Sequence, residues 1–215
     1  MPIAFFDLDR TVLSVNSGEA WVRRQVREGR LSRWTGVRAV WWIGLYHLGL
    51  ASLESVLEEA VATVEGEDEA ELIARNLLFF EEEVRHTVRA GAHLALQGHR
   101  DAGEPRVLLS TSSSLLCDRV AEELGLDGVV CTRLGVAEGR LTGRAEGPIC
   151  FGPAKVVLAE RWLAERGERL EEATFYTDSM SDLPVLERVA RPVVVHPDPR
   201  LRRVAAARGW PIQEW

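Results

Sequence analysis

The chain has 215 residues, of which 46% are hydrophobic, and a formal net charge of −7. This length is sufficient for an enzyme core with a second unit inserted into it. The negative charge, with no basic block to offset it, argues against general nucleic-acid binding. The three cysteines, Cys117, Cys131 and Cys150, lack the close spacing of a metal site, so we expect reduced thiols and a cytoplasmic protein.

The first predicted strand, residues 3–7, ends in two carboxylates, Asp7 and Asp9. Side chains alternate between the faces of a strand, so both carboxylates can enter one crevice only where the backbone begins to turn. Thr11 follows at this turn, and its hydroxyl can orient a neighbouring carboxylate. An Asp-x-Asp pattern alone also fits a charged strand end, so the downstream segments decide between a surface pair and a reactive pair.

Residues 14–90 have an almost purely helical pattern interrupted by glycines. Because the segment contains no turn-bounded pair of strands, it predicts an all-helical cap inserted after the first strand. Residues 39–53 carry no charge, but this run is shorter than the about 20 residues that span a bilayer, so no stable membrane insertion is expected. Packing inside the cap is one interpretation of the run, and a groove for lipid or for a substrate tail is the other.

Beyond the cap, short apolar runs alternate with segments of helical period. The runs that predict strands are residues 106–110, 128–132, 173–177 and 191–195. The segments that predict helices are residues 91–102, 114–124, 153–166 and 199–207. Strand–helix alternation of this kind predicts an α/β fold, a parallel sheet between two layers of helices.

The predicted Rossmann-like three-layer core therefore comprises residues 1–13 and 91–215, and the helical cap comprises residues 14–90. Residues 133–147, with glycines at turn positions, predict a β-hairpin instead of another crossover. Ligands bind at the carboxyl ends of the strands in such sheets, which directs attention to the residues that follow each strand.

Three later segments place polar side chains at such positions. Ser110, in a Ser-Thr-Ser cluster, ends the second strand, and Asp178 and Asp182 follow the strand at 173–177. Lys155 comes just after Gly-Pro at a helix start, and it is the only lysine among 26 basic residues. A single lysine in an arginine-rich chain suggests that a compact ammonium is needed there, because the two side chains are not equivalent. The alternative is one lysine retained by chance on a helix surface.

In this order, the four segments resemble the motifs of the haloacid dehalogenase superfamily of phosphohydrolases, and the likeness extends over nearly the whole chain. The chain is most similar to the phosphoserine-phosphatase-like branch (subfamily IB), which carries a helical cap between the first and second motifs. The resemblance implies a phosphatase that acts on a small-molecule phosphomonoester through an aspartyl-phosphate intermediate.

The resemblance also implies roles for individual residues. Asp7 would be the nucleophile, and Asp9 would protonate the leaving alcohol and then activate water. Ser110, the Thr111 amide and Lys155 would bind the phosphoryl oxygens, where preorganised charge lowers the barrier most. For Ser110, the N-cap of the following helix is a competing interpretation.

The expected cofactor is Mg²⁺, which prefers oxygen ligands and bridges carboxylates to a substrate phosphate. By the resemblance, its ligands would be the Asp7 carboxylate, the Asp9 backbone carbonyl and Asp178, with Asp182 acting directly or through water. A helix cap is the alternative role for Asp182, which precedes Leu-Pro.

The substrate is the point at which the chain departs from the branch. Phosphoserine phosphatases carry a glutamate seven residues after the second aspartate, and this chain has Asn16 there, with Glu19 nearby. We therefore expect a small or lipid-linked phosphomonoester other than phosphoserine, with Asn16 and Glu19 close to the substrate. Phosphoserine phosphatase activity proper and a non-catalytic binding module on the same fold are the alternatives, and the oligomeric state is left open.

Overall fold

The computed structural model describes residues 2–31 and 53–215, and its centre is a six-stranded sheet. The sheet has the order β3-β2-β1-β6-β7-β8, and every neighbouring pair is parallel. The strands are β1 (Ala4–Phe6), β2 (Arg106–Ser113), β3 (Gly128–Thr132), β6 (Thr174–Thr177), β7 (Arg191–Val195) and β8 (Ile212–Gln213). The predicted α/β class is confirmed, and β8 is the strand of this sheet that the sequence did not indicate.

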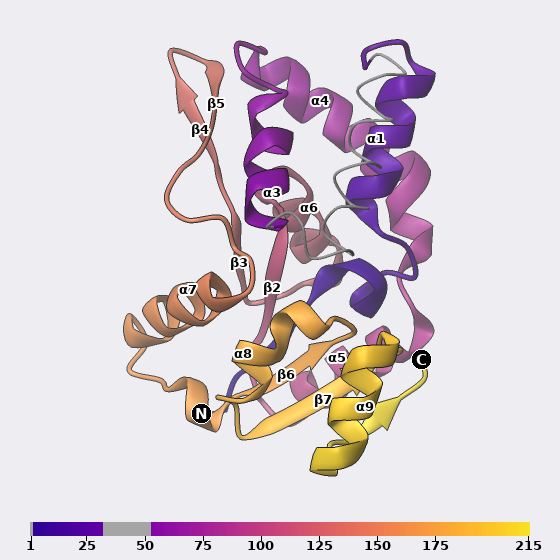
Figure 1. The fold of residues 1–215 in the computed structure, drawn as a ribbon, viewed down its shortest axis with the longest axis vertical. Coiled ribbons are helices and arrows are strands. Elements are labelled where there is room, and N and C mark those ends of the chain that lie inside the picture. Colours follow the sequence, from indigo (N-terminus) through magenta and orange to yellow (C-terminus); the bar gives the residue numbers. More distant parts are fainter. Residues whose placement is uncertain (1, 32–52) are drawn as a thin grey trace.

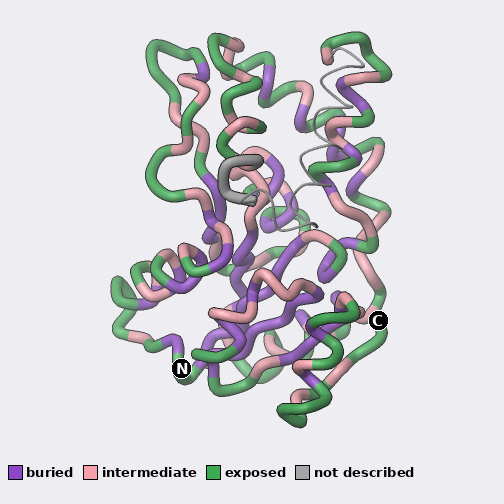
Figure 2. The backbone as a smooth tube through the Cα atoms, in the orientation of Figure 1, coloured by how far each residue is buried: buried purple, intermediate pink, exposed green. Residues whose placement is uncertain are grey.

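Helices cover both faces of the sheet (Figure 1). They are α5 (Ala90–Asp101), α6 (Ser114–Leu124), α7 (Pro153–Ala164), the short α8 (Leu183–Leu186) and α9 (Pro199–Arg208). Successive side chains of a strand face opposite layers, so Phe6 packs with α5 and α6 while Phe5 packs with α7, α8 and α9. The strands form the buried centre between these layers, as the purple tube in Figure 2 shows. The three-layer Rossmann-like core is therefore confirmed.

A second group of helices lies beyond the carboxyl ends of the strands (Figure 1). It consists of α1 (Ser17–Arg27), α3 (Leu53–Ala62) and α4 (Glu69–Phe79), and the turns η2 (Phe80–Val84) and η3 (Arg85–Thr87) lead from it back to the core. The two connecting segments run antiparallel, and Leu13 and Val88 form a β-bridge. The boundaries of the cap, 13/14 and 90/91, stay predictions, and the uncharged residues 39–52 lie outside the described residues.

A β-hairpin, β4 (Leu134–Ala137) and β5 (Arg140–Ala145), extends from the core alongside α3, in the segment where the sequence predicts one. Its tip is hydrogen bonded to the α3–α4 turn: Gly66 N donates to Leu141 O (2.8 Å), and Leu141 N donates to Glu67 O (2.9 Å). The sequence gives no sign that this hairpin joins the helical group. Across the described part of the chain, no helix has the length and apolarity needed to cross a membrane.

Candidate active site

Three neighbouring strands bring the predicted site residues to one edge of the sheet. β1 lies between β2 and β6, and Phe6 is in register with Leu108 and Tyr176. Asp7 therefore follows β1 beside Ser110 in β2 and Asp178 after β6. All three residues are buried, so the chemistry-bearing groups lie in a crevice instead of on the surface.

Lys155 lies within this crevice and is only 1% exposed. Its Nζ donates to Asp7 Oδ1 (2.8 Å) and to Asp182 Oδ2 (3.0 Å). Burial alone would lower the pKa of Lys155, but the carboxylates of Asp182 and Asp7 outweigh burial and raise this pKa. The only lysine of the chain is therefore a buried, charged ammonium between two carboxylates, and not a residue of the helix surface.

The Asp9 carboxylate has two hydrogen-bond partners from different parts of the chain. Ser17 N, at the first residue of α1, donates to Asp9 Oδ1 (2.7 Å), and the Ser112 hydroxyl donates to Oδ2 (3.0 Å). Burial raises the pKa of Asp9, and the hydrogen bonds from Ser17 and Ser112 partly offset this effect. Sequence reasoning missed both partners, although Ser112 belongs to the hydroxyl cluster that ends the second strand.

Asp178 is a buried carboxylate with few partners among the described residues. The Thr11 hydroxyl points to Asp178 Oδ1 at 3.4 Å, which agrees with the orienting role expected for Thr11. Burial first, and the nearby Asp182 second, raise the pKa of Asp178 to about 7. Asp198 holds the loop that carries Asp178: its carboxylate accepts from Met180 N (2.8 Å), and its amide donates to Asp178 O (2.9 Å).

The competing capping interpretations of two residues do not match the structure. Asp182 precedes α8, but its carboxylate accepts from the Thr177 hydroxyl (2.7 Å) and from Lys155, and makes no capping bond. Ser110 lies inside β2, and its hydroxyl accepts from Ser112 N (3.2 Å), while Ser113 precedes α6. The Ser110 hydroxyl is therefore available to the crevice, and the Asp182 carboxylate is available to the Lys155 ammonium.

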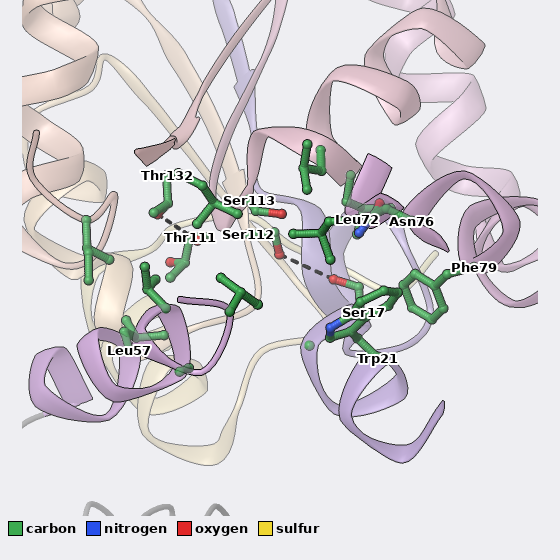
Figure 3. Close-up of a pocket in the computed structure, with 18 residues that line it drawn as sticks. Ser17, Trp21, Leu57, Leu72, Asn76, Phe79, Thr111, Ser112, Ser113 and Thr132 are labelled. Atoms are coloured by element: carbon green, nitrogen blue, oxygen red, sulfur yellow. Dashed lines mark hydrogen bonds between the residues drawn. The ribbon is translucent and has the colours of Figure 1, made fainter. Parts of the chain in front are cut away.

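A cavity of about 200 Å³ lies between the helices α1, α3 and α4 and the start of α6 (Figure 3). Among the lining residues that the structure describes, none carries a charge. Most are apolar, including Trp21, Leu57, Leu72, Phe79 and Leu116. Polar lining comes from Ser17, Asn76, Thr111, Ser112, Ser113 and Thr132. Because Ser17 and Ser112 are also the partners of Asp9, the cavity adjoins that carboxylate.

The sequence matches the family model of haloacid dehalogenase-like hydrolases over residues 4–187. The chain belongs to this family. Its parallel sheet between two layers of helices and its ordered acidic motifs agree with the resemblance inferred from the sequence alone.

Relatives of this hydrolase include named phosphatases. A histidinol-phosphatase of Neisseria meningitidis is 28% identical over 215 residues, covering 98% of this chain and 97% of the relative. A phosphoserine phosphatase of Mycobacterium tuberculosis is 33% identical over 157 residues, covering 73% of this chain and 51% of that protein. A crystal structure of a Bordetella pertussis protein with unknown function matches with a TM-score of 0.91 and 31% identity, covering 98% of this chain and 97% of that one. The chain is therefore a phosphatase of the haloacid dehalogenase family.

In this phosphatase, the two residues expected to select the substrate have other partners. Asn16 is the N-cap of α1, and its Oδ1 accepts from Glu19 N (2.9 Å). The Glu19 carboxylate pairs with the exposed Arg10 (3.0 Å). Neither Asn16 nor Glu19 lines the cavity. Their expected contact with substrate stays a prediction.

The four residues expected at a metal ion line the same edge but face different partners. Asp7 and Asp182 face Lys155, Asp9 faces Ser17 and Ser112, and Asp178 faces Thr11. Within the described residues, no three His, Cys, Asp or Glu side chains group closely enough to hold a metal by themselves. The available donors are all oxygens, and Asp178 has no ion pair with a described base, which suits a hard divalent cation.

Proposed function

We propose that this hydrolase is a Mg²⁺-dependent phosphatase that hydrolyses a small phosphomonoester through an aspartyl-phosphate on Asp7. The observation that supports this most strongly is the buried Lys155, whose ammonium contacts Asp7 and Asp182. A non-catalytic binding module would not need a charged group in so desolvated a position, because burying a charge is costly.

Asp7 is the proposed nucleophile. Burial raises the pKa of Asp7 well above its usual value, and the Lys155 ammonium at 2.8 Å opposes this effect and favours the carboxylate form that can attack phosphorus. The same ammonium, together with the Ser110 hydroxyl and the Thr111 amide, would neutralise the oxygens of the transferring phosphoryl group. Asp182 and the Thr177 hydroxyl hold the ammonium in place for this role.

Asp9 is the proposed general acid and base. A leaving alkoxide needs a proton, and the raised pKa of Asp9 favours the protonated carboxyl that can supply one. In the second half of the reaction, the resulting carboxylate would take a proton from the water that attacks the aspartyl-phosphate. Ser17 and Ser112 fix the orientation of this carboxyl group.

The residues at this edge fit Mg²⁺ as the cofactor. The carboxylates of Asp7 and Asp178 and the backbone carbonyl of Asp9 would bind it, and a role for Asp182, directly or through water, is also expected. Burial first, and Asp182 second, raise the pKa of Asp178 to about 7, so a cation bound beside this carboxylate would stabilise its charged form. A bound Mg²⁺ would supply charge neutralisation between the carboxylates and the substrate phosphate.

The substrate is proposed to be a small phosphomonoester. Histidinol-phosphatase and phosphoserine phosphatase, the names of two relatives, both describe enzymes for esters of small amino alcohols. The cavity volume of about 200 Å³ agrees with a compact leaving group. A lipid-linked ester is the second candidate, and it rests only on the uncharged residues 39–53 of the sequence.

The test is hydrolysis of a phosphomonoester panel with Mg²⁺ and with a chelator, for the wild type and Asp7→Asn. The proposal requires turnover that depends on Mg²⁺ and a phosphorylated wild-type protein, detected by mass spectrometry after acid quenching. Asp7→Asn should lose both, while Asp101→Asn, an exposed residue of α5, should keep both. A wild type that hydrolyses nothing on the panel would favour a binding module, and an active Asp7→Asn would rule out this nucleophile.

A further inference from the structure

The cavity under α4 contains a buried polar group, Asn76, that no contact with a described residue explains. Asn76, in α4, is 8% exposed, and no described residue donates a hydrogen bond to its Oδ1. Figure 3 shows Asn76 at the cavity, close to Leu72 and Phe79. Leaving a buried acceptor unpaired is costly, so a donor on a bound ligand would stabilise this side chain where the described residues supply none.

The place of the cavity relative to Asp9 indicates which part of a substrate it holds. Ser17 and Ser112 line the cavity and also bind the two carboxylate oxygens of Asp9. A general acid must contact the leaving oxygen, so the alcohol portion of the substrate lies on the side of Asp9. The cavity is therefore the space into which that alcohol portion extends from the phosphoryl site.

The lining determines what kind of alcohol fits. The walls described by the structure are mostly apolar side chains such as Trp21, Leu72 and Phe79, and none of them is charged. A group that carries both an ammonium and a carboxylate would lose its hydration there without gaining a counter-charge. An apolar or aromatic body would gain from burial, and a single donor on that body would satisfy Asn76.

We propose that Asn76 is a specificity-determining residue, whose side-chain oxygen accepts a hydrogen bond from a neutral N–H or O–H on an otherwise apolar leaving group. This inference rests on the proposed phosphatase function and adds the substrate class. The preferred substrates are phosphomonoesters of compact, mainly apolar or aromatic alcohols with one donor, and L-phosphoserine is a poor substrate.

The experiment compares 2-(4-hydroxyphenyl)ethyl phosphate, 2-phenylethyl phosphate and L-phosphoserine in wild type and Asn76→Leu. All kcat/KM values are divided by that for acetyl phosphate, whose leaving group is too short to reach α4. The wild type should prefer the hydroxyphenyl ester over the phenyl ester by roughly tenfold, since the buried acceptor is otherwise left unpaired. Asn76→Leu should remove that preference. Ala74→Gln, an exposed change two residues earlier in α4, should retain it.

Thermal melting separates a role in binding from a role in the fold. Leucine has the same number and branching of side-chain heavy atoms as asparagine, and the cavity can take its larger volume. Because leucine removes the unpaired acceptor, Asn76→Leu should melt at the same temperature as wild type or higher. A marked fall in Tm would show that Asn76 holds the fold, and it would overturn the proposal. An unchanged preference in Asn76→Leu, or a wild type that favours L-phosphoserine, would overturn it as well. If acetyl phosphate itself is not hydrolysed, the phosphatase proposal fails first.

Discussion

Replacing Lys155 with methionine tests the buried ion cluster most directly. Methionine is unbranched and similar in length, so Lys155→Met removes the charge with little change in packing. Asp7 and Asp182, at 2.8 and 3.0 Å from Nζ, are then left without their cation. Removing one partner of a buried ion pair costs about 3–5 kcal/mol. For a chain of this size, such a loss lowers Tm by roughly 10 °C.

The loss should depend on pH in a defined direction. Burial raises the pKa of Asp7 and Lys155 opposes this effect, so the pKa of Asp7 rises further in the variant. A carboxyl group whose folded pKa exceeds its unfolded pKa binds more protons in the folded state, so stability increases as the pH falls. The stability deficit of Lys155→Met should therefore be largest near about pH 8 and should shrink toward about pH 5.5.

The measurement is urea unfolding of the metal-free protein at both pH values, with a comparison of m-values to verify two-state behaviour. Arg161→Met is the matched control, since it removes an exposed charge from the same helix, α7, and should change stability by only about 0.5 kcal/mol. A deficit for Lys155→Met below about 1 kcal/mol, or one that grows as the pH falls, would refute this account of the cluster.

Four further outcomes follow from the same geometry. Lys155→Arg should lose most turnover on the phosphomonoester panel although it keeps the charge, because a planar guanidinium cannot replace a compact ammonium; wild-type kinetics would contradict this. The Mg²⁺ affinity, measured by calorimetry, should fall about tenfold per pH unit below the pKa of Asp178, because a carboxyl group with a pKa of about 7 must release its proton when the ion binds. An affinity that does not change with pH would contradict this. Burial raises the pKa of Cys150 to about 12, so the native protein should leave this thiol unmodified by a disulfide reagent that labels the unfolded chain. Asp198→Ala removes the acceptor of Met180 N and the cap of α9, so it should lower stability by about 1 kcal/mol and raise the Mg²⁺ concentration needed for half-maximal activity; unchanged Mg²⁺ dependence would leave Asp198 as a helix cap only.

The sequence predicted those features that depend on local periodicity. Phe5 and Phe6 alternate between two hydrophobic layers because they lie in a strand, and this pattern is visible in the residues themselves. Five of the six strands of the central sheet appear at the predicted places, whereas β8 has two residues and no pattern of its own. The position of Asp7 at a strand end also followed from the alternation of strands and helices.

Contacts between distant segments could not be predicted in this way. Ser17 and Ser112 are separated by 95 residues, and they meet at Asp9 only because α1 docks on the end of β2. Asn76 looks like an ordinary polar residue of an amphipathic helix until the packing of α4 buries it. Asn16 and Glu19 were singled out by their distance from Asp9 along the chain, which does not reveal that one caps α1 and the other pairs with Arg10.

The attachment of the hairpin to the α3–α4 turn constrains how the helical group can move. Two of the attachments of this group to the core are backbone pairings: Leu13 pairs with Val88, and the hairpin tip binds Gly66 and Glu67. A rigid body fixed at two points can rotate only about the line through them. An opening of the cavity that keeps both pairings would be a rocking motion about that axis, and it would separate Ser17 from Asp9. The alternative is a bend of the hairpin near its base, where Glu146 N donates to Arg133 O. The length of the hairpin, remote from the reacting atoms, would then set how widely the cavity opens.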